Sequence, residues 1–285
     1  MKYMVWATTA LMASTAMTQA GGIERSQQSV GILFEEGTYA ELGLAWSDPD
    51  VTGVSTPGAA NSGDMAPSYL VPSLSYRMDL TDQLSFALII GDHVGADANY
   101  PVGTGYPVQG STAELNGMAY TALLRYEFPS MVSVYGGLRI SQIEANVALP
   151  WLVNPAAPAL GGYIASADGG TELGYVVGAA YERPDIALRV ALTYNSAIDH
   201  TWQATETFSG VTTQGTFQTT IPQSLNLEFQ SGVAENTLVF GSIRWVDWSE
   251  FDITPPVYTF NTGGGSLVNY TDDRITYTLG VGRRF

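Results

Sequence analysis

Apolar and polar residues alternate along much of the chain, with the two-residue period of extended strands. The clearest case is the pair of runs TELGYVVGAAYER and IALRVALTYN, residues 171–183 and 186–195, which flank the turn Arg183-Pro184-Asp185. In both runs most of the large apolar residues share one face, whereas Glu, Arg, Gly, Thr and Asn fall on the other. Two alternating runs around a short proline turn predict a β-hairpin.

The same period recurs at about residues 39–46, 73–90, 115–142, 224–248 and 274–285. We count about ten strands, an even number as in bacterial outer-membrane β-barrels. The count becomes about twelve if the link 95–114 or the link 203–216 hides a short hairpin, and a count of up to about fourteen stays open. The segment 238–248 does not keep a clean phase, which predicts a β-bulge there.

The links between these strands alternate in length. Short turns are predicted near residues 79–83, 128–131, 183–185 and 233–236, and long links rich in Gly, Pro, Ser and Thr at 49–67, 95–114, 150–170, 203–216 and 254–268. Short turns at one end and long loops at the other are typical of a transmembrane antiparallel β-barrel. A secreted sandwich or a lipocalin-like barrel would alternate as well, so the polarity of the two strand faces must decide.

The polarity of the two strand faces favours a transmembrane barrel over a soluble sandwich or barrel. Only 13% of the residues are charged, against roughly 25% in an average soluble domain. The polar strand face holds Arg and Glu among small residues, and the only lysine is Lys2, near the start. Small residues suit a crowded lumen, and arginine suits buried ion pairs. The predicted lumenal charge network consists of Arg77, Arg125, Arg139, Arg189, Arg274, Glu127, Glu172 and Glu228.

The first residues, MKYMVWATTALMASTAMTQA, predict a secretory signal peptide that is cleaved after Ala20. Without Lys2 the chain carries 11 − 1 = 10 basic and 27 acidic residues, a formal charge of 10 − 27 = −17. Such a surface excludes nucleic acid as a partner. There is no cysteine for a disulfide framework or a thiolate metal site, and no later apolar stretch reaches the ~20 residues of a membrane-spanning helix.

The chain stops within an alternating segment, RITYTLGVGRRF, in which Arg283 interrupts the apolar face. Because lipid tolerates no free strand edge, we expect the last strand to pair with the first. The final residue, Phe285, is similar to the terminal signature that the barrel-assembly machinery reads in outer-membrane proteins.

The segment IPQSLNLEFQSGVAENTLVFGSIRWVDWSEFDI, residues 221–253, resembles the penultimate hairpin of the FadL-type outer-membrane transport proteins (OMPP1/FadL/TodX). The matching positions are Pro222, Ser224, Leu225, Trp245, Trp248 and Ser249. The segment GGIERSQQSVGILFEEGTYAELG is similar to the N-terminal plug of that family. The resemblance implies a signal peptide at 1–20, a plug at 21–36 and an outer-membrane barrel at 37–285.

The resemblance also implies passive transport of hydrophobic compounds, such as long-chain fatty acids, by loop capture, pocket binding and lateral release through a kinked third strand. The apolar loop 150–164 suggests a capture groove, or packing on a neighbouring loop or against lipopolysaccharide. A glycine in the third strand could mark the lateral opening or merely a bulge. Plug residues could touch the ligand or only anchor the plug. The predicted ligand-contacting residues are Leu33, Phe34, Gly91, Trp151, Leu152 and Val153.

The alternative function is a structural or adhesive barrel without transport. Catalysis is not expected, because His93 and His200 adjoin Asp92 and Asp199 in the sequence, and neighbours on a strand point to opposite faces. The acidic loop 48–50 offers too few oxygen ligands for calcium. No metal and no cofactor is predicted, and the partners are a hydrophobic small molecule, outer-membrane lipid and lipopolysaccharide.

Overall fold

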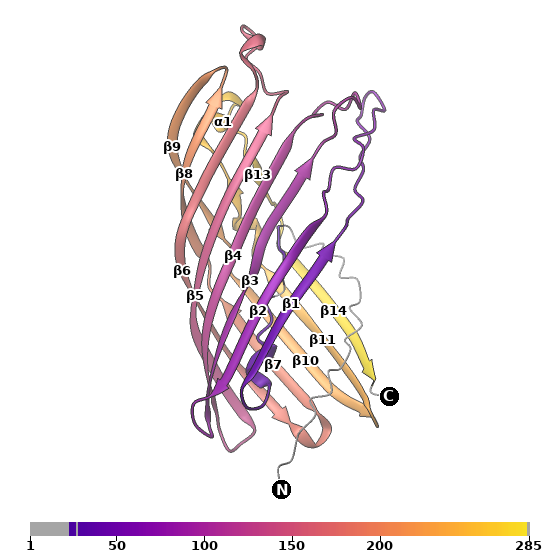
Figure 1. Ribbon diagram of the computed structural model, residues 1–285, viewed down its shortest axis with the longest axis vertical. Helices are drawn as coiled ribbons and strands as arrows, with labels where there is room; N and C mark the ends of the chain where they lie inside the picture. Colours follow the sequence, from indigo (N-terminus) through magenta and orange to yellow (C-terminus); the bar gives the residue numbers. More distant parts are fainter. Residues whose placement is uncertain (1–22, 27, 284–285) are drawn as a thin grey trace.

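The computed structural model describes residues 23–26 and 28–283, most of which lie in one antiparallel sheet that curls around a lumen (Figure 1). The strands of the sheet are β1 (Tyr39–Ser47), β2 (Tyr69–Asp79), β3 (Leu84–Asn99), β4 (Thr112–Glu127), β5 (Val132–Leu149), β6 (Tyr163–Arg183), β7 (Leu188–Asn195), β8 (Ile198–Phe208), β9 (Val211–Ile221), β10 (Ser224–Ala234), β11 (Thr237–Val246) and β14 (Arg274–Arg283). This all-β, barrel-type architecture confirms the predicted fold class. No helix of the described chain is long and apolar enough to cross a membrane.

Ten strands follow one another around the described wall, in agreement with the predicted count of about ten. The other two, β8 and β9, continue β7 and β10 in the same register, so they extend the wall rather than widen it. The link 203–216 does hide a hairpin, formed by β8 and β9 around Ser209 and Gly210, whose φ angles are 51° and 73°. Figure 1 shows β8 and β9 rising above β10, β11 and β14.

All four predicted short turns join neighbouring strands, namely β2 to β3, β4 to β5, β6 to β7 and β10 to β11. The bulge predicted within 238–248 is wrong. The register shift lies in β10, between Gly232 and Ala234, whereas β11 pairs with β14 without a shift. The phase of β11 is misleading because Leu238 and Phe240 line an inner cavity, where apolar residues were not expected.

In the half of the wall next to the short turns, which we call the turn-side half, apolar side chains point outward and arginines inward, as predicted. Leu42 and Leu44 are 81% and 72% exposed, and Tyr277 is 72% exposed. By contrast, Arg77 and Arg125 are each only 5% exposed. A barrel with a polar interior and an apolar outer wall is the arrangement that a lipid bilayer requires.

In the other half, which we call the loop-side half, the polarity is reversed. Along β5, Gln142 and Glu144 point outward and are exposed, whereas Ile143 and Val147 are buried at 3% and 9% exposure. Inward side chains of β3, β4, β6, β8 and β9 complete the same apolar interior. This part of the wall therefore has the polarity of a soluble barrel and lies beyond the bilayer.

Strand irregularities mark the boundary between the two halves. The β3–β4 pairing shifts between Asp92 and Val94, and the β5–β6 pairing between Gln142 and Glu144. Short breaks also separate β7 from β8 and β9 from β10 at this level. Along β3, β6, β7–β8 and β9–β10 the apolar residues stay at every second position on both sides of the boundary. The irregularity at the boundary turns the strand by one residue, so these positions face outward in the turn-side half and inward in the loop-side half.

Two segments outside the wall fill the lumen. The N-terminal segment, residues 23–36, contains the short helix η1 (Gly31–Phe34) and packs Val30 and Leu33 against inner side chains of the turn-side half. The cover segment, residues 248–273, contains η4 (Trp248–Glu250), β12 (Asp252–Ile253), α1 (Pro256–Asn261) and β13 (Val268–Asn269), and packs against the loop-side half. Short 3-10 helices also occur at η2 (Pro158–Leu160) and η3 (Pro184–Ile186). The predicted plug role of residues 21–36 stays a prediction.

The two ends of the sheet remain apart. Within the described strands β1 pairs only with β2, and β14 pairs only with β11. The predicted pairing of the first strand with the last is therefore not formed in this structure. The predicted signal peptide, residues 1–20, and the terminal Phe285 lie outside the described residues.

Candidate pocket at a split in the wall

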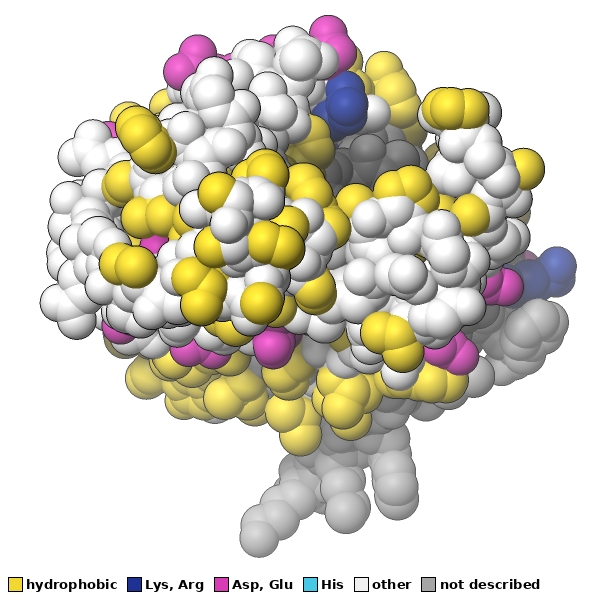
Figure 2. Space-filling view, turned by 90° about the horizontal axis from the view of Figure 1, so that it is seen from above, with side chains coloured by type: hydrophobic (Ala, Val, Ile, Leu, Met, Phe, Trp, Pro, Cys, Tyr) yellow, Lys and Arg dark blue, Asp and Glu magenta, His cyan; other side chains and the backbone are white. Residues whose placement is uncertain are grey.

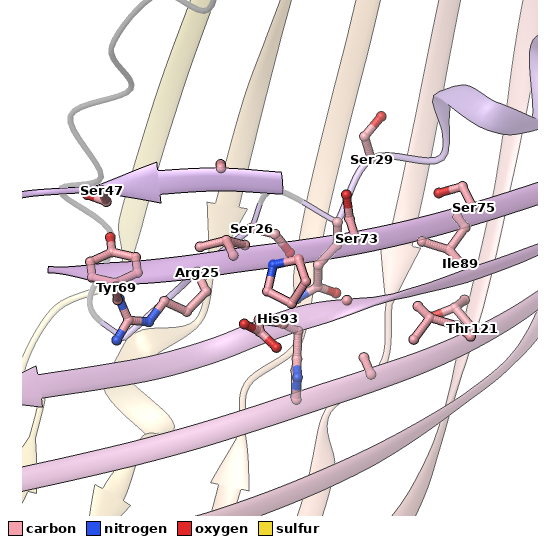
Figure 3. Close-up of a pocket in the computed structure, with 18 of the residues that line it drawn as sticks. Arg25, Ser26, Ser29, Ser47, Tyr69, Ser73, Ser75, Ile89, His93 and Thr121 are labelled. Carbon is pink, nitrogen blue, oxygen red and sulfur yellow. The ribbon is translucent and has the colours of Figure 1, made fainter. Parts of the chain in front are cut away.

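A cavity of about 750 Å³ lies between the N-terminal segment and strands β1 to β5 (Figure 3). This volume falls within the range of small-molecule sites. Its lining combines apolar side chains with hydroxyl groups and two arginines, and includes Arg25, Ser29, Trp46, Tyr69, Val71, Pro72, Ser73, Ser75, Ile89, Gly91, His93, Ala119, Thr121 and Arg139. Trp46 belongs to the outer wall and Arg139 to the lumen, so the cavity extends through the wall.

The cavity reaches the wall because β2 and β3 separate. Their pairing runs from Asp79 opposite Ser85 up to Ser73 opposite Gly91, and ends there. Above this point the edge of β3 pairs with the N-terminal segment instead, through a bridge between Glu24 and Val94. Gly91 is thus the last residue of β3 beside β2, which places this predicted residue at the lower end of the split.

Arg25 closes the upper part of the split. Its guanidinium lies 3.5 Å from the centre of the Tyr69 ring on β2 and forms an ion pair of 2.5 Å with Asp97 on β3. The backbone N–H of Arg25 donates to the carbonyl of His93, at 3.1 Å. Arg25 therefore links the two separated strands through contacts that an ordinary β-ladder would not supply.

Arg139 brings a buried cation to the inner end of the cavity. It is 6% exposed and donates to Thr121 Oγ1 at 2.9 Å and to the side chain of Gln28. Among the described residues no carboxylate lies within ion-pair distance of Arg139. The nearby Glu24 pairs with Arg244 at 2.5 Å, which leaves a net positive charge on these three groups. An unneutralised buried cation is costly, so the site favours an anionic guest.

The two histidines lie side by side and share a contact with one serine. His93 and His200 each place Nε2 at 3.0 Å from the hydroxyl of Ser141. Their Nδ1 atoms face the carbonyls of Gly117 and Gly169 and must therefore carry protons, because a carbonyl only accepts. The Ser141 side chain is fully buried, so this serine cannot meet a substrate. The group anchors the bulges at the boundary.

The predicted ligand residues are dispersed over the molecule. Leu33 is fully buried, and Phe34 stacks between Arg125 and Arg189, whose guanidinium groups lie 4.8 and 4.6 Å from its ring centre. Trp151 is 43% exposed at the loop end. Its neighbours in the sequence are Leu152, which packs on buried residues of the loop-side half, and Val153, which is half-buried.

The predicted charge network is organised differently from the expectation. Arg125 pairs with Glu127 at 3.3 Å and with Glu182, which sequence reasoning did not include. Other predicted members have separate partners: Arg77 pairs with Asp79, Glu228 accepts from Ser29 and from the N–H of Val30, and Arg274 donates to the carbonyls of Asp272 and Asp273. Glu172 is half-buried on β6, opposite Ser141.

Sequence reasoning missed the cover segment as a lumenal element. Trp248, Phe251 and Ile253 are 1%, 1% and 6% exposed, although they lie in what was expected to be a strand end and a surface loop. The available signal was the crowding of aromatic residues in RWVDWSEF. Within the described chain no group of three or more His, Cys, Asp or Glu side chains is placed to hold a metal ion.

A membrane-spanning barrel with a pocket that opens through its wall defines a class of outer-membrane transport barrels. The sequence matches the family model "Outer membrane protein transport protein (OMPP1/FadL/TodX)" over residues 10–283. The chain therefore belongs to this family, as the resemblance predicted, and its location is the outer membrane of Gram-negative bacteria. No curated protein matches the sequence.

Several solved structures share the fold. The chain is similar to the Ralstonia pickettii toluene transporter TbuX, with 16% identity, coverage of 88% of this chain and 74% of the other, and a TM-score of 0.59. A Pseudomonas aeruginosa FadL homologue is 15% identical, with coverage of 86% of this chain and 66% of the other and a TM-score of 0.54. The TodX deltaS2S3 mutant monoaromatic hydrocarbon channel is 15% identical, with coverage of 76% of this chain and 63% of the other and a TM-score of 0.54. The chain thus spans about two thirds of the length of two of these relatives.

Proposed function

We propose that the protein is a passive outer-membrane transporter of hydrophobic compounds with an anionic end, long-chain fatty acids or similar. The observation that supports this best is the cavity that runs from the buried Arg139 to the split between β2 and β3. Toluene and monoaromatic hydrocarbons are named for several structural relatives, which makes hydrophobic cargo the natural choice for this fold.

Capture begins at the loop end of the barrel. Figure 2 shows apolar side chains gathered toward the middle of this face, with acidic side chains around them. Val102, Trp151, Leu160 and Phe260 are 80%, 43%, 58% and 85% exposed there. At about 25 cal/mol per Å² of buried apolar surface, contact with a few such side chains holds a hydrophobic molecule weakly and reversibly.

Binding then uses both kinds of surface in the cavity. The alkyl part of the ligand packs against Val71, Ile89 and Ala119, and its carboxylate accepts hydrogen bonds from Arg139. Release follows through the split next to Gly91, where Pro72 and Ser73 are the nearest groups of β2. The lower end of the split lies at the level of the strand irregularities, so the ligand enters the outer edge of the bilayer there.

Uptake of radiolabelled palmitate tests this function. Cells that express the protein should take up palmitate faster than cells without it, and deletion of residues 21–36 should change the rate. Gly91→Leu should slow uptake, because a Cβ at Gly91 would already lie 3.3 Å from the carbonyl of Pro72. Equal uptake in all these cells would instead support the structural or adhesive barrel.

A further inference from the structure

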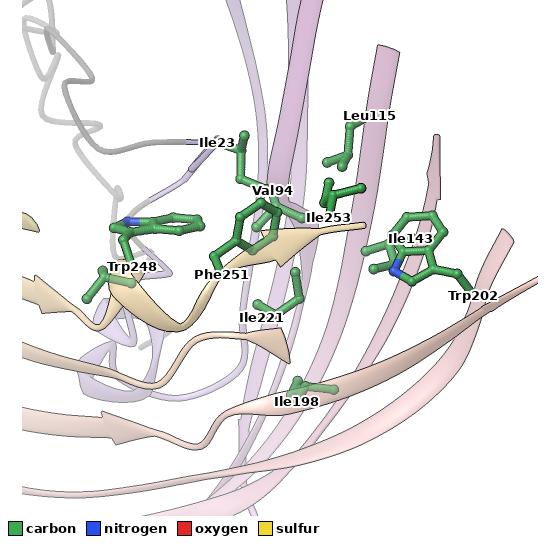
Figure 4. Close-up of a cluster of buried hydrophobic side chains, with 11 residues drawn as sticks. Ile23, Val94, Leu115, Ile143, Ile198, Trp202, Ile221, Trp248, Phe251 and Ile253 are labelled. Carbon is green, nitrogen blue, oxygen red and sulfur yellow. The ribbon is translucent and has the colours of Figure 1, made fainter. Parts of the chain in front are cut away.

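The loop-side half of the barrel is an apolar trough that is filled by the chain itself. Ile143, Ile198 and Trp202 form part of its inner face, Phe251 of the cover segment packs in the same cluster, and Trp248 packs on Phe251 (Figure 4). All five side chains are at most 4% exposed. The trough is therefore a hydrophobic surface whose occupant is a separate piece of chain rather than a neighbouring wall strand.

Few directional contacts hold the cover segment in place. Within the described chain, no backbone–backbone hydrogen bond joins residues 248–272 to a wall strand. The Glu206 carboxylate on β8 accepts from the N–H groups of Val257 and Tyr258, both at 3.0 Å. The Thr219 hydroxyl on β9 donates to the carbonyl of Asp252 at 2.9 Å. An element attached mainly by side-chain packing separates more easily than one bonded into a sheet.

The two ends of the cover segment meet, so that it can move as a unit. Ser249 donates to Asp273 at 2.9 Å, and Trp245 of β11 donates to the same carboxylate at 3.1 Å. Gly263 and Gly264 adopt φ angles of 73° and 100° in the turn after α1, a backbone conformation that favours glycine. The segment is thus a closed loop with its own internal pairing between β12 and β13.

The covered state also leaves polar groups unsatisfied. The indole N–H groups of Trp202 and Trp248 are both buried and have no hydrogen-bond partner among the described residues. Burial of an unpaired donor lowers the stability of the state that contains it. A guest with an acceptor oxygen could satisfy such a donor, which the apolar side chains of the cover cannot do.

We propose that the trough lined by Ile143, Ile198, Trp202 and Ile221 is a second ligand site. The cover segment occupies this site when no ligand is bound and is displaced when a ligand binds. This inference rests on the proposed transport function and adds a binding step to it. The outer wall of the loop-side half is polar, so a hydrophobic molecule that arrives at the loops has no apolar path along the outside. The trough provides such a path inside, once Trp248 and Phe251 move away.

A disulfide can hold the cover segment closed. A Cβ placed on Gly215 of β9 would lie 4.0 Å from Cβ of Pro256 in α1, within the range of about 3.5–4.5 Å that disulfides require. The chain contains no cysteine, so the double variant Gly215→Cys/Pro256→Cys can form only this intramolecular bond. Neither position belongs to the trough or to the cavity beside Arg139.

The oxidised double variant should take up radiolabelled palmitate at least tenfold more slowly than the same protein after reduction. The single variant Gly215→Cys should be insensitive to the redox treatment, and heat-dependent gel migration reports that each barrel has folded. If oxidised and reduced forms transport equally, the cover segment is a fixed part of the fold and the inference is wrong. If neither the wild type nor the reduced variant transports palmitate, the proposed function fails and takes the inference with it.

A second variant opens the cover instead. Glu206→Gln keeps the shape of the side chain but removes its charge, which weakens acceptance from Val257 and Tyr258. We expect faster palmitate uptake and stronger quenching of tryptophan fluorescence by acrylamide than in the wild type. Unchanged uptake and quenching would contradict the role given to Glu206 and to cover displacement.

Discussion

Arg139 is the residue on which the choice of cargo depends. Most buried arginines of the described lumen have a carboxylate partner, such as Glu182 for Arg125 and Glu24 for Arg244. Among the residues that the structure describes, the hydrogen-bond acceptors of Arg139 are the neutral side chains of Thr121 and Gln28, and Arg139 faces the cavity. A charged hydrogen bond to a carboxylate stabilises more than a neutral one, so an anionic ligand gains most at this position.

Replacement of Arg139 should affect the uptake of an anionic ligand and of a neutral ligand differently. Arg139→Met is expected to reduce palmitate uptake about tenfold or more, since one charged hydrogen bond contributes roughly 1.5–3 kcal/mol, while toluene uptake changes little. Arg183→Met is the control, because Arg183 forms an exposed pair with Asp185 at the short turn. Equal losses for palmitate and toluene would show that Arg139 only maintains the fold.

Close packing at single glycines sets the shape of the wall. A Cβ on Gly178 would overlap the ring of Tyr135, whose hydroxyl contacts Thr193 at 2.7 Å. Gly178→Ala should therefore lower the free energy of unfolding by about 1–3 kcal/mol. Gly282→Ala is the matched control, since the nearest atom to its new methyl group, on Phe240, would be 3.9 Å away. Urea unfolding in lipid vesicles followed by tryptophan fluorescence measures both.

The strand edges are the elements that the membrane constrains most. Two edges occur at the split between β2 and β3, and there the N-terminal segment supplies backbone bonds such as Gly95 N–H to the carbonyl of Ile23, at 2.7 Å. Two more edges occur on β1 and β14, which have no partner on that side within the described strands. The outward side chains of β1 and β14 are apolar and face lipid, where an open strand edge costs several kcal/mol for each unsatisfied backbone group, so these two edges require a partner strand.

We therefore expect β1 and β14 to pair in the protein without residues 1–20. Cysteine pairs that combine Leu42 or Leu44 with Tyr277 or Leu279, all outward-facing, should include at least one that cross-links on oxidation in outer membranes. Pairs that combine Leu42 or Leu44 with Leu173, on the distant β6, provide the negative control. The closure prediction is wrong if no β1–β14 pair cross-links under conditions that oxidise free thiols.

The wall as a whole has two halves of opposite polarity, one above the other. Arginines fill the turn-side half, and aromatic and aliphatic side chains fill the loop-side half. The change occurs within a few residues along β3 to β6, between β7 and β8 and between β9 and β10, at the level of the His93–Ser141–His200 group. The outer edge of the bilayer must lie at this level, because only the turn-side half presents an apolar outer surface.

The position of the bilayer gives a direct test. Leu138→Cys lies on the outward face of the turn-side half, and Gln142→Cys lies on the same face of β5 beyond the boundary. A membrane-impermeant maleimide applied to intact cells should label Gln142→Cys readily and Leu138→Cys at least tenfold more slowly. Comparable labelling rates at the two positions would place the boundary elsewhere.

The alternation of apolar and polar residues was sufficient to predict the all-β class, the short turns and the inward arginines. This works because a wall between lipid and a polar lumen forces a two-residue period on each strand. The same rule was less informative beyond the boundary, where β8 and β9 were predicted only as a long link that could hide a short hairpin. Their inward residues, such as Trp202, are apolar and their outward residues, such as Gln203, are polar, the reverse of the pattern sought.

The candidate pocket could be located only in part. Gly91, which the sequence placed in the third strand, lines the cavity, but nothing local in the sequence pairs Arg25 with Tyr69 and Asp97, or sets Arg139 beside Thr121. These contacts join residues that are far apart in the chain. Their distances follow from how the strands curl and where the N-terminal segment enters.

Local sequence therefore determined the strands, their turns and the polarity of each face, because these depend on neighbours within a few residues and on the solvent that each face meets. The tertiary structure decided where the wall splits, which arginines are neutralised, and that residues 248–273 turn inward. Those outcomes depend on how strands distant in sequence are stacked around one lumen, and side chains such as Trp248 find their partners only after the wall has formed.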